Sequence, residues 1–127
     1  MKIFKNMEKT IKFEFEYSTE DDVLTIYDYN KKPFETVEFS EFLNISLDKD
    51  RLIVGMEIID ASSFFGVFDK GVNKEFLENL DGVDLEQVEI RNTAFVVVCL
   101  RSADKLVKRE LPPMNFRGYE SPLVTSL

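Results

Sequence analysis

The stretch IKFEFEYSTEDDVLTIYDY, residues 11–29, decides the fold of this chain. In residues 11–17 apolar side chains alternate with charged ones, which is the period of a strand with one buried face. Residues 18–22 are polar and predict a turn, and residues 23–29 are rich in β-branched and aromatic side chains. The stretch therefore predicts an antiparallel hairpin.

The strand pattern continues beyond this hairpin. A turn at 30–33 leads to a short strand around residues 34–39, and in Phe42–Asp48 apolar side chains again alternate with polar ones. Leu52–Ile59 is apolar on both faces, so we expect it to be a central strand that is covered from both sides.

Two short helices are predicted after this strand. Asp60 is a candidate N-cap for a helix in residues 61–68, because a carboxylate accepts hydrogen bonds from the free N–H groups of a first turn. In that helix Phe64, Val67 and Phe68 are expected to face the sheet.

The second helix is expected to begin at Asn73 and to end at Gly82. Its apolar side is formed by Phe76, Leu77 and Leu80.

Three further strands follow, in residues 85–91, 94–101 and 106–111, and predict an antiparallel meander. The predicted fold class is α+β: a mainly antiparallel β-sheet with two short helices between an N-terminal and a C-terminal group of strands. Residues 1–111 are expected to form a single domain, because the chain of 127 residues has the usual size of one.

Residues 112–127 predict an extended C-terminal tail, which begins with two prolines. Its side chains Phe116, Arg117, Tyr119 and Leu123 are candidate interaction residues. The tail is expected to pack either on its own body or on a neighbouring subunit, and an exchanged tail makes an oligomer.

The net charge of −8 is unevenly distributed. Residues 1–12 carry four basic and one acidic side chain, residues 13–90 carry six and twenty, and residues 91–127 carry six and three, which sum to +3, −14 and +3. Nucleic acids and anionic membranes select clustered Lys and Arg, so this charge argues against both ligands and favours a protein partner, either the same chain or a basic protein. The single Cys excludes an internal disulfide, and a cytoplasmic protein is expected.

Glu57, Asp60 and Asp22 are the candidate catalytic residues. A carboxylate in an apolar strand, as predicted for Glu57, needs hydrogen bonds or a cation, and otherwise its pKa rises as in catalytic acids. The alternative is structural, with Glu57 bonded to main-chain N–H groups or to a Lys or Arg, and Asp60 acting as a cap. The chain has no His, its acidic spacing matches no metal motif, and Cys99 lies in an apolar run, so neither a metal nor a cofactor is expected.

Two segments together resemble a known family. They are YSTEDDVL at 17–24 and GMEIIDAS at 55–62, and they are similar to the domain of unknown function family 2283, whose pattern has Tyr, polar residues, Asp-Val-Leu, and then Val-Gly-x-Glu-Ile-x-Asp-Ala-Ser. The resemblance covers about residues 13–63 and implies a compact sheet but no activity. Members usually have Asp-Gly-Arg where this chain has Asp50, Arg51 and Leu52, so a turn of different shape is expected there.

These observations favour a non-catalytic protein-interaction or structural module that acts through a homomeric or heteromeric interface. The alternative is a small enzyme or ligand-binding domain that uses a carboxylate cluster of Glu57, Asp60 and Asp22 in a cleft beside the first helix. The two hypotheses differ in whether these carboxylates converge around a pocket.

Overall fold

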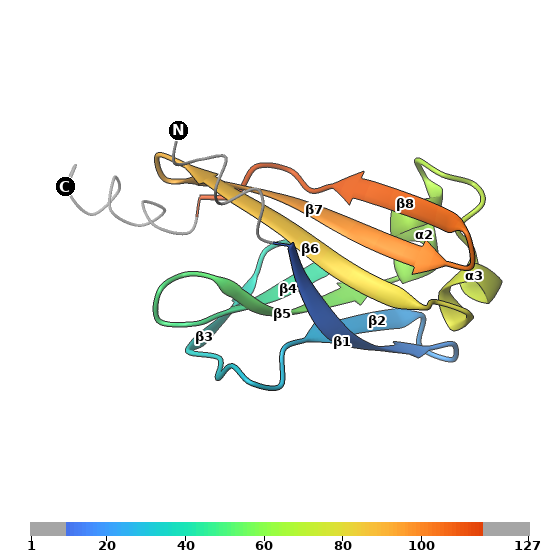
Figure 1. The fold of residues 1–127 in the computed structure, drawn as a ribbon, viewed down its shortest axis with the longest axis horizontal. Helices are drawn as coiled ribbons and strands as arrows, with labels where there is room; N and C mark the ends of the chain where they lie inside the picture. The colour runs from blue at the N-terminus through green and yellow to red at the C-terminus, as the bar shows by residue number, and fades with distance from the viewer. Residues whose placement is uncertain (1–9, 116–127) are drawn as a thin grey trace.

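The computed structural model describes residues 10–115, with side chains described from Phe13 onward (Figure 1). The strands are β1 (Thr10–Ser18), β2 (Val23–Tyr27), β3 (Glu35–Glu38), β4 (Leu43–Leu47), β5 (Ile53–Ile59), β6 (Gly82–Ile90), β7 (Thr93–Ser102) and β8 (Lys105–Glu110). The helices α2 (Ala61–Gly66) and α3 (Lys74–Glu78) lie between β5 and β6. This order confirms the predicted α+β class, with two short helices between two groups of antiparallel strands.

The described strands form one antiparallel sheet in the order β3-β4-β5-β2-β1-β6-β7-β8. β1 belongs to both groups of strands, because its residues 10–13 pair with β6 and its residues 14–18 pair with β2. Figure 1 shows β1 crossing from β6 to β2, so that β6–β8 run at an angle to β2–β5. The change of partner within β1 lets the sheet bend and turn one face of each group inward.

The inward faces of the two groups share one core. Its fully buried side chains include Ile26, Ile45 and Ile58 from the first group and Val98 and Leu100 from the second. Each such side chain stabilises the fold by about 1.5–3 kcal/mol when it leaves water. The alternation predicted for residues 42–48 is confirmed, since every second residue of β4 is buried.

The central position predicted for residues 52–59 is also confirmed, because β5 lies between β4 and β2. The prediction that this strand is covered on both faces holds only for its first half. There the N–H of Asp28 donates to the carbonyl of Val54 at 3.0 Å, which holds the connection after β2 against β5. Further along the strand, Glu57 is exposed.

The turn between β4 and β5 contains a left-handed residue. Arg51, at the position where the resembled family usually has Gly, has a φ of 69°. The N–H of Arg51 donates to the carbonyl of Asp48 at 3.1 Å, and the side chain of Asp48 accepts from Leu52 N–H at 3.0 Å. The turn therefore has a left-handed backbone at this position, a conformation that glycine adopts without strain.

The face predicted for the first helix is wrong. α2 ends at Gly66, so the residues at 67 and 68 lie beyond it, and Ala61 and Phe65, four positions apart, are its buried side chains. Val67 and Phe68 are 73% and 75% exposed, and Phe64 is only half-buried. A helix of six residues is too short for a repeated apolar stripe to specify its face.

The start of the second helix is confirmed, and its predicted end is wrong. The side chain of Asn73 accepts a hydrogen bond from Phe76 N–H at 2.9 Å, as an N-cap does, but α3 already ends at Glu78. Gly82 instead begins β6 opposite Arg101, where a Cβ would clash with the guanidinium. Neither α2 nor α3, nor any other helix within residues 10–115, is long and apolar enough to cross a membrane.

Candidate functional site

Asp22 lies at the junction of the first hairpin and α2, where it accepts three hydrogen bonds. The hydroxyl of Tyr17 donates to Oδ1 at 2.6 Å, the N–H of Ser62 donates to Oδ1 at 3.0 Å, and the hydroxyl of Ser62 donates to Oδ2 at 2.7 Å. The carbonyl of Asp22 also accepts from Ala61 N–H at 2.9 Å. We call the side-chain network of Tyr17, Asp22 and Ser62 the clasp, because it ties the turn after β1 to the first turn of α2.

The clasp replaces the cap that was predicted for Asp60, and that prediction is wrong. Asp60 occupies the N-cap position but has a φ of 54°, and its side chain makes no capping hydrogen bond. The carboxylate that caps α2 comes from Asp22, which is 40 positions from Ser62 in the chain. Ser62 itself takes part through its N–H and its hydroxyl.

The electrostatics of the clasp favour an ionised Asp22. Burial opposes the charged form of Asp22, but the hydrogen bonds from Tyr17 and Ser62 outweigh it and lower the pKa of the carboxyl below its usual value. For Tyr17, burial and the bond to Asp22 raise the pKa of the hydroxyl well above its ordinary value. An ionised acceptor with a protonated donor on each side is a stable arrangement for a cap, and it leaves Asp22 poorly suited to take up a proton.

Glu57 lies on the outer face of β5, and the burial expected for it is wrong. Its carboxylate is exposed and accepts one hydrogen bond, from the side-chain amide of Asn44 at 3.0 Å. The bond comes neither from a main-chain N–H nor from a Lys or Arg. Two hollows include Glu57 in their walls, and neither is lined by Asp22 or Asp60.

The chemistry available to these residues is limited. Within residues 10–115 no three His, Cys, Asp or Glu side chains gather in a way that could hold a metal ion. Cys99 is buried, as expected, and burial raises the pKa of its thiol. A protonated thiol is a poor nucleophile. The described residues therefore show no set of catalytic groups around Glu57, Asp60 and Asp22.

Strand pairing builds a different feature on the outer face of the first group of strands. One row of directly opposed residues crosses five strands in the order Glu16, Thr25, Glu57, Asn44, Glu38. A second row, parallel to the first, runs in the order Glu14, Tyr27, Gly55, Ser46, Thr36. Opposed residues of antiparallel strands share a face, so both rows point outward together.

The carboxylates of these two rows define an acidic face. Glu14, Glu16, Glu38 and Glu57 are all exposed, and neither row contains a Lys or Arg. Sequence reasoning missed the acidic face, because the register that aligns the five strands is set by pairing between distant residues. The sequence contains part of this signal, in the alternation of Glu14 and Glu16 with the aromatic residues Phe13, Phe15 and Tyr17.

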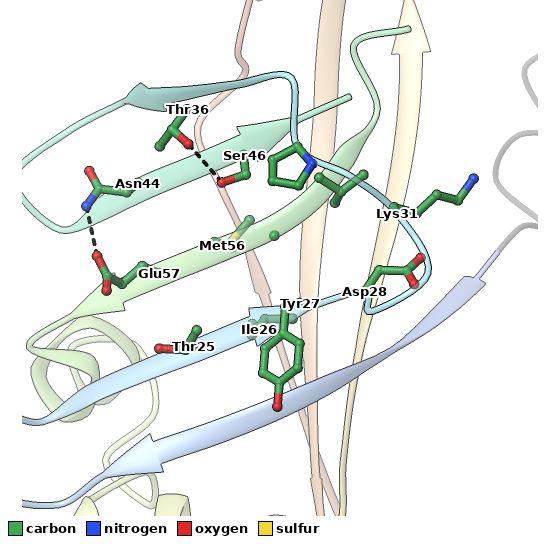
Figure 2. A pocket seen from close by; sticks show the side chains of 13 residues that line it. Thr25, Ile26, Tyr27, Asp28, Lys31, Thr36, Asn44, Ser46, Met56 and Glu57 are labelled. Carbon is green, nitrogen blue, oxygen red and sulfur yellow. Dashed lines mark hydrogen bonds between the residues drawn. The ribbon is translucent and has the colours of Figure 1, made fainter. Parts of the chain in front are cut away.

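A groove of about 330 Å³ runs along this face (Figure 2). Gly55 lies within it between Tyr27 and Ser46, where the missing side chain leaves space. Figure 2 shows two hydrogen bonds beside the groove, between Asn44 and Glu57 and between Thr36 and Ser46, the second at 3.1 Å. Lys31 lines the groove from the connection after β2.

The candidate interaction residues of the tail, Phe116, Arg117, Tyr119 and Leu123, lie outside the described residues. The first residues of the predicted tail are described. Met114 exchanges two main-chain hydrogen bonds with Ala94, at 2.6 and 3.0 Å, and is 1% exposed. The core therefore extends beyond residue 111.

A segment of the chain is similar to a known protein family. Residues 14–62 match the family described as a protein of unknown function, DUF2283, which confirms the resemblance seen in the sequence. No curated protein and no solved structure shows a significant match to the chain. The matched segment runs from the hairpin to Ser62 and contains the whole clasp.

Proposed function

We propose that this protein is a non-catalytic protein-binding module whose acidic face binds a basic segment of a partner protein. The observation that supports the proposal is the alignment of Glu16, Glu57 and Glu38 in one exposed row across the sheet. Positive charge opposite such a row speeds association and selects against acidic partners. The matched family has no assigned activity, so the family match neither supports nor opposes a binding role.

The spacing of the row indicates the shape of the partner. Neighbouring strands lie about 4.8 Å apart, so Glu16, Glu57 and Glu38, which are on every second strand, lie about 10 Å apart along the row. Seven residues of an α-helix, about two turns, rise about 10.5 Å. A helix with a Lys or Arg at every seventh position therefore matches the three carboxylates when it lies across the strands.

The first experiment measures binding of a helical peptide to the full chain by fluorescence anisotropy. The probe is an alanine-rich peptide of about 18 residues with Lys at every seventh position, and the control peptide has the same composition with Lys placed around the helix. We expect the aligned peptide to bind more tightly, and added salt to weaken the binding because the charges are exposed.

Matched variants of the protein separate the acidic face from net charge. Glu16→Gln, Glu38→Gln and Glu57→Gln together are expected to weaken binding about tenfold, since each exposed ion pair contributes about 0.2–1 kcal/mol. The control combines Asp50→Asn, Glu75→Gln and Asp104→Asn, which remove the same charge elsewhere. An equal loss in both variants, or equal binding of the two peptides, contradicts the proposal.

We also propose that the C-terminal residues Phe116, Arg117, Tyr119 and Leu123 form a second, homomeric contact in a cytoplasmic oligomer. The aromatic and aliphatic side chains of Phe116, Tyr119 and Leu123 support this. The test is light scattering on the full chain and on a truncation after Asn115, which keeps the core residue Met114. If the full chain and the truncation are both monomeric at the same concentrations, this contact is ruled out.

A further inference from the structure

Arg109 of β8 has an unusual environment for a cation. Its guanidinium carbon lies 4.0 Å from the ring centroid of Phe64 and 4.3 Å from that of Phe68, and one N–H group donates to the carbonyl of Phe64. Among the ion pairs within residues 10–115 none involves Arg109. Burial lowers the pKa of the guanidinium. Because the Arg109 guanidinium is partly buried and has no carboxylate partner among the described residues, most of its five N–H donors are available to an anion.

A hollow of about 540 Å³ adjoins this guanidinium. Its walls include the apolar residues Phe68, Leu111, Pro112 and Pro113 and the charged residues Lys108 and Glu110, so it offers apolar surface next to Arg109. Phe68 is 75% exposed, although it is one of the two aromatic rings stacked on the cation. The stacked rings hold the guanidinium in one orientation, which prepares it for a carboxylate that binds through two oxygens.

The hollow lies along β8, the last strand of the described sheet. One side of an edge strand has main-chain N–H and C=O groups free to pair with an extended segment. β8 carries three basic residues, Lys105, Lys108 and Arg109, and one acidic residue, Glu110, in an otherwise acidic protein. Neighbouring residues of a strand point to opposite faces, so Glu110 and Arg109 project from different faces of β8, although both residues line the hollow.

We propose that the edge of β8 binds an extended acidic segment of another protein by strand addition. A Glu or Asp of that segment binds Arg109 through both carboxylate oxygens. An apolar side chain two positions away, on the same face and about 6.8 Å along the strand, occupies the hollow beside Phe68. Lys105 and Lys108 form ion pairs with Asp69 and Glu86, so within the described part of the chain Arg109 is the basic residue of β8 without an ion pair, and its charge favours an acidic segment.

The test uses a labelled octapeptide with Glu and Phe two positions apart in a Ser- and Thr-rich background, bound to the full-length protein. The first control replaces Glu with Gln, and the second places Glu and Phe at adjacent positions, which puts them on opposite faces. We expect each control to bind about tenfold more weakly, because each loses one of the two contacts. Hydrogen exchange on the complex is expected to show slower exchange in residues 105–110.

Two variants of the protein keep the test decisive. Arg109→Lys keeps the charge but removes the bidentate hydrogen-bond donor. Phe68→Ala removes an exposed ring without opening the core. Each variant is expected to bind the peptide with Glu and Phe two positions apart at least about fivefold more weakly than the wild type. The variant that lacks Glu16, Glu38 and Glu57 carboxylates is expected to bind it at least as well as wild type. Unchanged binding in Arg109→Lys and Phe68→Ala, equal binding of the Gln peptide, or slowed exchange elsewhere would overturn the proposal.

Discussion

Asp22 in the clasp and Glu57 on the acidic face are both carboxylates of the family-matched segment, and the protein uses them in opposite ways. Asp22 accepts three hydrogen bonds in a half-buried junction, whereas Glu57 accepts one bond from Asn44 and is exposed. A carboxylate whose acceptor sites are occupied inside the protein stabilises the fold and has little capacity left for a ligand. An exposed carboxylate with one partner contributes little to the fold and remains available for binding.

The largest expected effect is the loss of the clasp in Asp22→Ala. The substitution leaves the Tyr17 hydroxyl and both donors of Ser62 without their acceptor and places alanine at a φ of 55°. We expect the free energy of unfolding to fall by about 3 kcal/mol, since bonds to a charged group contribute about 1.5–3 kcal/mol and a left-handed alanine costs about 1 kcal/mol. Urea denaturation measures it, and Asp22→Asn, which tolerates this backbone, is expected to lose less. A loss below that of an ordinary surface substitution contradicts the structural role.

Removing one donor of the clasp has a smaller effect. Tyr17→Phe deletes the hydroxyl that lies 2.6 Å from Asp22 and keeps the ring, so the unfolding free energy is expected to fall by about 1 kcal/mol. The measurement is thermal unfolding at neutral pH. In the double variant with Asp22→Asn the loss is expected to be less than the sum of the two single losses, and additive losses would show that the two groups do not interact.

The ionisation of Asp22 predicts how the stability of the fold changes at acid pH. Because the folded-state pKa of Asp22 is lowered, its contribution is present above the pKa of an unfolded Asp, about 3.9, and is lost as the pH falls through the folded-state pKa. The wild type is therefore expected to lose stability below about pH 4 more steeply than Asp22→Asn. Denaturation midpoints measured between about pH 2.5 and 6 test this, with Glu57→Gln as the control. Parallel curves for wild type and Asp22→Asn exclude a role of Asp22 ionisation.

Glu57→Gln is expected to have the smallest effect on the fold. The side chain is exposed, and Gln still offers a carbonyl oxygen to Asn44, so the unfolding free energy is expected to change by less than about 0.5 kcal/mol. Binding of the aligned basic peptide is expected to weaken about threefold, as one exposed ion pair predicts. A large loss of stability with unchanged peptide binding would reverse the roles assigned to the two carboxylates.

Much of the secondary structure was predictable, because it depends on short-range alternation. The hairpin of β1 and β2, the strand β4 and the meander of β6 to β8 were each indicated by residues that are adjacent in the chain. The face of α2 was not predictable, since a helix that ends at Gly66 leaves too few positions to define an apolar side. The end of α3 was missed because Gly82 was interpreted as a helix terminator, although it makes space for Arg101 across the sheet.

The α+β class, the alternation within the strands, the acidic middle of the chain and the family resemblance could all be predicted from the sequence, because they depend on composition and on neighbouring residues. Only the tertiary structure decided that Asp22 caps a helix that begins 39 positions later at Ala61, that Glu57 is exposed, and that Glu16, Glu57 and Glu38 form one row. These features depend on the pairing register of strands that are distant in the chain. That register is set by the shared core, in which Ile26, Met56 and Ile45 oppose one another on the inward face while their neighbours align outside.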